Sequence, residues 1–198
     1  YMKFLFDLGG VFFDWDPNHF FKDIFDKAEE REYFLTEVCN DEWNIQQDAG
    51  RTIKEAEAVL IPKFPQYEKQ IKMYYQNHRK MIRGTFNSSI KVLDKLKKKN
   101  YECYVLSNWS AETFVGMTDD YPFLQSFNGL LISGEDNLMK PDAAIYELAI
   151  SRFNLIPQET VFIDDKLENI EAAKKLNLKT IHLVDPNIIE LEIDKFLV

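Results

Sequence analysis

The 198-residue sequence has little cysteine, fewer basic than acidic residues and no long apolar run. Its two cysteines, Cys39 and Cys103, lack the spacing of metal ligands, and two thiols without a disulfide framework suit a reducing cytoplasm. The formal net charge of −9 argues against nucleic acid and anionic membrane surfaces as partners. No stretch approaches the length of a membrane-spanning helix, and the first apolar run is too short for a signal peptide. We therefore expect a cytoplasmic protein without a nucleic-acid, membrane or obligate protein partner.

The length of the chain and its hydrophobic content of 45% allow one domain with a substantial core, or such a core with a small insert. The acidic composition is compatible with an anionic substrate, because local cations and a bound metal can reverse the field inside one cleft. No internal repeat or low-complexity segment interrupts the sequence.

The order of elements divides the chain into a helical segment and a region in which strands and helices alternate. Residues 18–83 carry apolar side chains at helical spacing, and Thr52 with Glu55 forms a capping box that opens one of these helices. The strands that we expect are residues 2–6, 103–106, 129–132, 160–163 and 180–184. The helices that alternate with them are residues 89–100, 111–120, 141–153, 170–176 and 188–196, with Pro141 in the first turn of its helix.

Strands separated by helices of this length form right-handed crossovers, and the product is a parallel sheet with helices on both faces. The sequence therefore predicts an α/β fold, a doubly wound parallel sheet with an inserted α-helical segment. We expect the sheet domain to comprise residues 1–14 and 84–198, and the helical domain to comprise residues 15–83.

Polar residues follow three of the expected strands at the point where each strand ends. Asp7 ends the first strand and is followed by Gly9 and Gly10. Ser107-Asn108 ends the second strand, and Asp164-Asp165 ends the fourth. Glycines allow the backbone to approach a ligand closely, and the carboxyl ends of parallel strands meet at the edge where ligands bind. We therefore expect an active site at this edge of the sheet.

Four short motifs resemble those of the haloacid dehalogenase superfamily, most of whose members are Mg-dependent phosphatases with an aspartate nucleophile. The motifs are residues 6–11 (FDLGGV), 106–108 (LSN), 140–141 (KP) and 162–170 (FIDDKLENI). The resemblance covers the chain apart from the helical segment, which is similar to the α-helical cap of the superfamily. It implies a Rossmann-like sheet domain with the cap inserted after the first strand.

The resemblance assigns the chemistry to Asp7, whose carboxylate would attack phosphorus and form an aspartyl-phosphate intermediate. It implies Mg²⁺ as the cofactor, held by the Asp7 carboxylate, the Gly9 carbonyl oxygen, the substrate phosphate and Asp165. Asp164 would support the metal from outside its ligand shell.

The same resemblance assigns phosphate binding to Ser107 and the Asn108 N–H group, and charge neutralisation to Lys140. Trp109 directly follows the second motif, and we expect it to face the crevice and contact the substrate, with core packing as the alternative. Trp15 is interpreted in the same way. Surface or packing roles are favoured for the three histidines, His19, His78 and His182.

The sequence departs from the superfamily at Gly9. Most phosphatases of the superfamily carry a second aspartate there, which protonates the leaving oxygen and later activates water. Dehalogenases of the superfamily also lack this acid, but they need no metal, whereas the Asp164-Asp165 pair suits a metal site. A bacterial branch that hydrolyses sugar 1-phosphates shares the Asp-Leu-Gly start and a later Asp-x-Asp, which Asp14 and Asp16 match. Loop solvation and helix capping explain these two aspartates equally well.

We therefore expect a Mg-dependent phosphatase of small phosphorylated metabolites, with sugar 1-phosphates as candidate substrates. Two alternatives remain open: a metal-independent 2-haloacid dehalogenase, and a catalytically weak phospholigand-binding protein that has lost its general acid. The sequence does not identify the physiological substrate, because the cap selects it.

Overall fold

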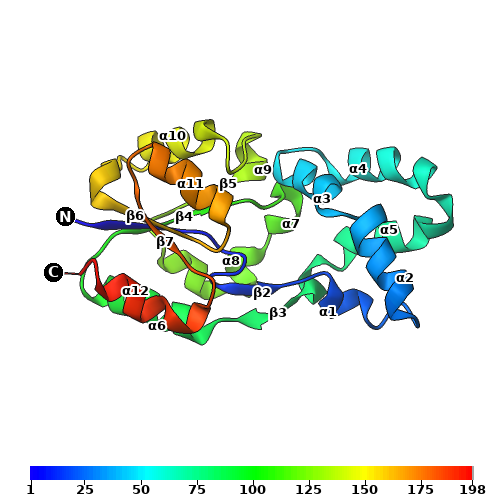
Figure 1. Cartoon of the computed structure of the whole chain (residues 1–198), viewed down its shortest axis with the longest axis horizontal. Helices are drawn as coiled ribbons and strands as arrows, with labels where there is room; N and C mark the ends of the chain where they lie inside the picture. Colours follow the sequence, from blue (N-terminus) through cyan, green and yellow to red (C-terminus); the bar gives the residue numbers. More distant parts are fainter. Residues whose placement is uncertain (198) are drawn as a thin grey trace.

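A computed structural model describes residues 1–197, and Figure 1 shows a central sheet on one side of the molecule and a group of helices on the other. Within these residues the central sheet has five strands in the order β5-β4-β1-β6-β7, and every neighbouring pair is parallel. The strands are β1 (Lys3–Phe6), β4 (Cys103–Ser107), β5 (Gly129–Ile132), β6 (Thr160–Asp164) and β7 (Lys179–His182). The predicted doubly wound parallel sheet is confirmed.

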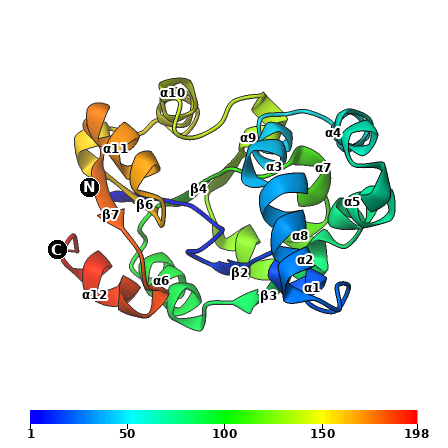
Figure 2. The ribbon, with the colours of Figure 1, turned by 45° about the vertical axis from the view of Figure 1, so that its right-hand side comes forward.

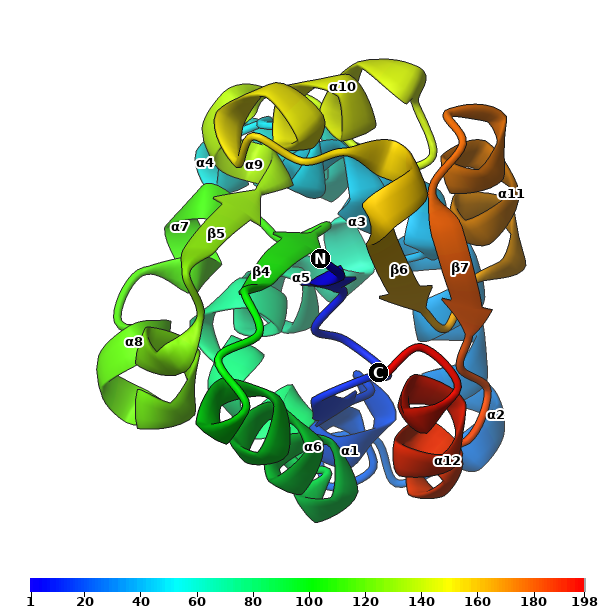
Figure 3. The same ribbon diagram turned by 90° about the vertical axis from the view of Figure 1, so that its left-hand side faces the viewer.

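Helices cover both faces of this sheet, as the end-on view in Figure 3 shows. Those on one face are α6 (Asn87–Lys98) and α12 (Ile189–Asp194), and those on the other are α10 (Ala143–Arg152) and α11 (Leu167–Lys175). The side chains of β1 alternate between the two faces, with Phe4 and Phe6 in the core next to α6 and Leu5 in the core next to α10. Burial on both faces explains why the strand is an almost continuous apolar run.

A second group of helices, the cap segment (residues 16–81), has an apolar core of its own. It includes α1 (Asn18–Phe21), α2 (Ala28–Tyr33), the π-helix η1 (Phe34–Val38), α3 (Asp41–Asp48), α4 (Ile53–Leu60) and α5 (Glu68–Gln76). Phe21 is buried at its centre, with ring centroids 5.0 Å from Phe34 and 5.9 Å from Tyr74. The predicted capping box is confirmed, because the Thr52 hydroxyl accepts from the Glu55 N–H group and the Glu55 carboxylate accepts from the Thr52 N–H group.

Two short antiparallel strands, β2 (Phe13–Trp15) and β3 (Ile82–Thr85), connect the sheet to the cap segment. The sequence prediction missed both strands, because so few residues cannot establish an alternating pattern. The expected domain boundaries, 14/15 and 83/84, both fall inside this ribbon. We keep the division into a sheet domain and a cap as a proposal, which the separate apolar cores support.

Two of the expected helices differ from the structure. The helix expected over residues 111–120 is two short helices, α7 (Ala111–Phe114) and α8 (Met117–Asp120), because Gly116 between them has a φ of +81°. The helix expected from Pro141 begins at Ala143, with Asp142 as its N-cap residue, so Lys140 lies in the preceding loop. Other short helices are α9 (Ser133–Asp136), η2 (Ile61–Lys63), η3 (Pro65–Tyr67), η4 (His78–Met81), η5 (Pro122–Ser126), η6 (Pro157–Glu159) and η7 (Pro186–Ile188). Throughout residues 1–197, every helix is too short or too polar to span a membrane.

Hydrogen bonds fasten the cap segment to the region that follows β4. The Arg79 guanidinium donates to the carbonyl oxygens of Thr113 and Val115, each at 2.7 Å. The Ile53 N–H group, at the start of α4, donates to the Glu112 carboxylate at 2.9 Å. Figure 2 shows the result, in which α3 lies beside α9 at the edge of the sheet.

His78 lies where the cap segment meets the sheet. Its ring packs against Trp15 and Trp109, with centroid distances of 6.1 Å and 5.5 Å, and 9% of the residue is exposed. Burial, together with the smaller effect of the Arg79 charge, lowers the pKa of His78 from 6.5 to about 4. The imidazole of the folded protein is therefore neutral at pH 7.

We predict that His78 makes the fold sensitive to acid between its unfolded pKa of 6.5 and its folded pKa of about 4. In this range the unfolded chain binds a proton at His78 and the folded chain does not, so the free energy of unfolding falls as the pH falls. For a pKa shift of this size, His78 should lower the free energy of unfolding at pH 4.5 by about 2–3 kcal/mol relative to pH 7. Urea unfolding of the wild type and of His78→Phe at pH 7 and pH 4.5 measures it, because the variant keeps an aromatic ring without a titratable group. Equal acid destabilisation of both proteins would contradict the prediction.

Candidate active site

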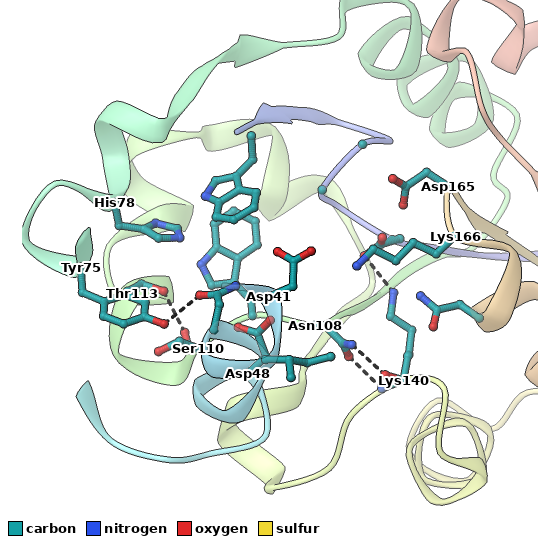
Figure 4. Close-up of a pocket in the computed structure, with 18 residues that line it drawn as sticks. Asp41, Asp48, Tyr75, His78, Asn108, Ser110, Thr113, Lys140, Asp165 and Lys166 are labelled. Atoms are coloured by element: carbon teal, nitrogen blue, oxygen red, sulfur yellow. Dashed lines mark hydrogen bonds and ion pairs between the residues drawn. The ribbon is translucent and has the colours of Figure 1, made fainter. Parts of the chain in front are cut away.

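Three strand ends meet at one edge of the sheet, as the sequence predicts. Asp7 directly follows β1, and Ser107 and Asp164 are the last residues of the neighbouring strands β4 and β6. A cavity of about 380 Å³ opens at this edge, between the sheet and the cap segment (Figure 4). The predicted site residues on its wall are Asp7, Gly9, Asn108, Trp109, Lys140 and Asp165. Ser107 and Asp164 are buried behind the wall.

The Lys140 ammonium group lies buried at the centre of the site, with 1% of the residue exposed. Its Nζ lies 2.9 Å from Asp7 Oδ1, and it donates to Asp164 Oδ2 at 2.7 Å and to the Leu106 carbonyl oxygen at 2.9 Å. Because an ammonium group has three N–H bonds, this set of acceptors engages all of them. Lys140 therefore fixes the position of the Asp7 carboxylate.

The two adjacent aspartates at the end of β6 have different surroundings. Asp164 is completely buried, and both of its oxygens accept hydrogen bonds, from the side chains of Lys140 and Asn169. Asp165 lines the cavity, and its Oδ1 is buried without a hydrogen-bond partner among residues 1–197. One carboxylate oxygen each of Asp7, Asp164 and Asp165 lies within 4.8 Å of the other two. A buried carboxylate oxygen without a donor fits a cation, so Asp7 and Asp165 are the candidate metal ligands.

Burial and ion pairing together set the charges of the site. Burial raises the pKa of Asp7 to about 7, Lys140 opposes this shift, and the carboxylates of Asp164 and Asp165 add to it. Burial alone would lower the pKa of Lys140, but the attraction of Asp164 and Asp7 outweighs it and raises that pKa. Lys140 is therefore positively charged, and the remaining surplus of carboxylates favours a bound cation.

The two glycines after Asp7 differ in what a side chain would meet. Gly10 has a φ of +76°, and a Cβ there would collide with the Asp165 carboxylate, so glycine is required. A Cβ at Gly9 would meet no atom of residues 1–197 within 4 Å, and Gly9 lies on the cavity wall. Neither the backbone nor the packing therefore imposes the absence of a carboxylate at Gly9.

In the second motif, the Ser107 side chain has no hydrogen-bond partner within residues 1–197, whereas the Asn108 side chain is bonded to the main chain of Lys140. The Ser107 hydroxyl is buried and has no hydrogen-bond partner in residues 1–197. The Asn108 Oδ1 accepts from the Lys140 N–H group at 2.8 Å, and the Asn108 Nδ2 donates to the Lys140 carbonyl oxygen at 2.9 Å. This double hydrogen bond holds the loop of Lys140 against the end of β4. Trp109 packs edge-on against Phe13 and also forms part of the cavity wall, and its contact with a substrate stays a prediction.

Asp14 and Asp16 are not among the residues of the cavity wall. Asp14 Oδ1 lies 2.9 Å from His19 Nε2, and its Oδ2 lies 2.6 Å from Arg83 Nη2. Burial alone would raise the pKa of Asp14, but hydrogen bonds from His19 and Arg83 lower it. Asp16 Oδ1 accepts from the Asn18 N–H group at 2.8 Å, at the start of α1. The structure thus favours ion pairing and capping over a catalytic role for these aspartates.

The cap segment contributes wall residues that the sequence prediction missed. They are Asp41, Asn44, Ile45, Asp48, Tyr75 and His78. Ser110, Thr113, Lys166 and Asn169 of the sheet region also line the cavity. No motif marks the cap residues, because the side of a helix that faces a cavity depends on tertiary packing.

Comparisons with known proteins agree with this geometry. A sequence model of the family described as haloacid dehalogenase-like hydrolase matches residues 4–183. A sesquiterpene phosphatase of Aspergillus oryzae is 24% identical over 181 residues, which cover 91% of this chain and 89% of that protein. A solved HAD (haloacid dehalogenase) family enzyme of Bacteroides thetaiotaomicron, in complex with magnesium and inorganic phosphate, is 25% identical. Its TM-score is 0.69, and the match covers 91% of this chain and 92% of that chain.

A solved L-2-haloacid dehalogenase of Xanthobacter autotrophicus is 14% identical, with a TM-score of 0.63 and coverage of 91% of this chain and 76% of that chain. At this identity the likeness shows the fold alone. The family match, by contrast, spans all four motifs, from the strand end at Asp7 to the paired aspartates. The chain therefore belongs to the haloacid dehalogenase-like hydrolases.

Proposed function

We propose that this hydrolase is a Mg-dependent phosphatase of small phosphorylated metabolites that works through an aspartyl-phosphate on Asp7. The arrangement of Asp7 carries the proposal: Lys140 holds its carboxylate at 2.9 Å, and one of its oxygens lies within 4.8 Å of an Asp165 oxygen. Three similarities support the proposal: the family to which the chain belongs, the sesquiterpene phosphatase of Aspergillus oryzae, and the Bacteroides thetaiotaomicron enzyme in complex with magnesium and inorganic phosphate.

The residues at the sheet edge fit Mg²⁺. Asp7, the Gly9 carbonyl oxygen and Asp165 would hold the ion, and the unpartnered Asp165 Oδ1 supports this assignment. Asp164 would hold the Lys140 ammonium group in position by accepting its hydrogen bond. When bound, the ion would screen the repulsion between the Asp7 carboxylate and a phosphate group.

The groups of the chain itself account for the transfer to Asp7. Its carboxylate oxygen would form a bond to phosphorus while the bond from phosphorus to the leaving oxygen breaks. Lys140 would hold the attacking carboxylate in place and stabilise the negative charge that develops. The Ser107 hydroxyl, which has no partner inside residues 1–197, would bind a phosphate oxygen together with the Asn108 N–H group.

The finer proposal is that the substrates are sugar 1-phosphates. The described cavity wall combines aromatic rings with carboxylate, amide and hydroxyl groups, and its one aliphatic side chain is that of Ile45. Such a wall suits a polyhydroxylated leaving group better than a hydrocarbon. An anomeric hydroxyl is also more acidic than an ordinary sugar alcohol, so its phosphate depends less on the acid that Gly9 cannot supply.

Asp7→Asn should abolish the hydrolysis of 4-nitrophenyl phosphate, because an amide cannot form the intermediate. The loss should be about 10⁴–10⁶-fold, as for other covalent catalysts. The change is nearly isosteric, so the circular dichroism spectrum should not change. Asp94→Asn alters an exposed carboxylate on α6 and is the matched control, with full activity expected. A tenth of wild-type activity in Asp7→Asn would exclude Asp7 as the nucleophile.

Removal of metal with excess EDTA should abolish hydrolysis, and added Mg²⁺ should restore it. Calorimetric titration should show Mg²⁺ binding weakened about 10–100-fold in Asp164→Ala, as expected for a group outside the ligand shell. Asp165→Ala should weaken it more, because Asp165 has the unpartnered oxygen. Undiminished hydrolysis in chelator would instead favour the 2-haloacid dehalogenase, and halide release from 2-chloropropionate would then be measured.

Glucose 1-phosphate should react faster than glucose 6-phosphate in single turnover, and 4-nitrophenyl phosphate faster than both in the chemical step. Each pKa unit of leaving-group acidity contributes at most ~1.4 kcal/mol, or about tenfold in rate. Farnesyl phosphate, a sesquiterpene phosphate, is the hydrophobic comparison and should react more slowly than the sugar esters. Faster reaction of glucose 6-phosphate would show that leaving-group acidity does not compensate for Gly9. No product from any ester would favour the phospholigand-binding protein.

A further inference from the structure

Gly9 leaves the proposed phosphatase without an acid next to its nucleophile, and the cavity offers few replacements. The titratable residues on the wall are Asp7, Asp41, Asp48, Tyr75, His78, Lys140, Asp165 and Lys166. The Tyr75 hydroxyl already donates to Asn44 Oδ1 at 2.7 Å. His78 has a lowered pKa of about 4, so it carries no extra proton near neutral pH. Asp41 is exposed at the amino end of α3.

We propose that Asp48, the last residue of α3, is the acid that protonates the leaving oxygen and the base that then activates water. This inference rests on the proposed phosphatase function. Figure 4 shows the Asp48 side chain projecting into the cavity from the cap segment, on the side that faces Lys140 and Lys166. The cap segment would thus supply the group that Gly9 lacks.

The Ser133 hydroxyl, at the start of α9, links the Asp48 main chain to the loop that follows β4. The Ser133 hydroxyl accepts from the Trp109 N–H group at 3.0 Å and donates to the Asp48 carbonyl oxygen. Because Ser107 and Asn108 precede Trp109 directly, the same loop positions the phosphate-binding groups and the proposed acid.

The surroundings of Asp48 place the pKa of its carboxyl group near neutral pH. Burial raises the pKa of Asp48 to about 7, although the charges of Lys166 and Lys140 and the Ser110 N–H group lower it. The carboxyl end of α3 carries partial negative charge, which also disfavours the ionised form. The other charged or titratable wall residues around the cavity are Asp7, Asp41, Tyr75, His78 and Asp165. A carboxyl group that titrates near neutral pH is suited both to donate and to accept a proton.

The proposed reaction has two steps. In the first step an Asp7 oxygen bonds to phosphorus, the bond from phosphorus to the leaving oxygen breaks, and the Asp48 proton moves to that oxygen. Asp48 is then a carboxylate. In the second step it takes a proton from water as the water oxygen attacks phosphorus, which releases Asp7 and inorganic phosphate and returns Asp48 to its acid form.

The test compares leaving groups in Asp48→Asn, which keeps the size and shape of the side chain without a carboxyl proton. Single-turnover hydrolysis of glucose 6-phosphate should fall about 10²–10⁴-fold, because its alkoxide needs a proton. Release of 4-nitrophenolate in the first turnover should change less than tenfold, since this leaving group needs no proton. Steady-state hydrolysis of 4-nitrophenyl phosphate should then be slow, so that a burst of one equivalent appears. Glu42→Gln, on the same helix and off the cavity wall, is the matched control.

Two further measurements separate proton transfer from structural damage. The double variant Gly9→Asp/Asp48→Asn should hydrolyse glucose 6-phosphate at least tenfold faster than Asp48→Asn. The new carboxyl group can supply the proton, and a Cβ at Gly9 has open space. The wild-type rate on glucose 6-phosphate should decline above pH 7, and Asp48→Asn should lose this decline. If Asp48→Asn does not fold, Asp48→Ala with added formate replaces it, and rescue by formate is expected.

Equal losses for both esters without a burst, or no rescue by Gly9→Asp or formate, would overturn the role of Asp48 while leaving the phosphatase intact. Failure of the phosphatase proposal has a different signature. In that case the wild type hydrolyses no phosphate ester, or Asp7→Asn retains its activity.

Discussion

The buried charge cluster around Lys140 is the constraint on which the site depends. One ammonium group joins the ends of three strands, through Asp7 after β1, the Leu106 carbonyl oxygen on β4 and Asp164 on β6. Oxygens of Asp7, Asp164 and Asp165 lie within 4.8 Å of one another, and such proximity is costly in a buried site unless cations compensate it. Lys140 compensates part of this charge, and the remainder gives the cavity its affinity for a cation. The double hydrogen bond of Asn108 to the Lys140 main chain keeps the lysine in place.

The sheet side of the site follows largely from local sequence. The apolar runs of β1, β4 and β6 each end at a polar residue, and parallel pairing brings Asp7, Ser107 and Asp164 to one edge. Lys140 is different, because it does not end a strand, and its role came from the family resemblance. Its two hydrogen bonds and its ion pair with Asp7 depend on the conformation of the loop before α10, which begins at Ala143 and not at Pro141.

The cap side could not be predicted in the same way. Asp48 and His78 lie at the ends of elements whose orientation depends on packing against the sheet region, through hydrogen bonds such as those of Arg79. Periodicity identifies the helices and one capping box, but it does not indicate which residues line a cavity between two parts of the chain. The ribbon of β2 and β3 that joins these parts is too short to leave a pattern.

Placing the proton donor on the cap segment changes how the proposed reaction is controlled. When the acid and the nucleophile both follow β1, their relative position does not depend on the cap. Here Asp7 belongs to the sheet region and Asp48 to the cap segment, and the hydrogen bond from Ser133 to the Asp48 carbonyl oxygen helps to set the distance between them. Proton transfer would therefore require the cap segment to lie in this position against the sheet region. The segment that contacts the leaving group would then also decide when that group is protonated, so the choice of substrate and the chemical step would depend on the same contacts.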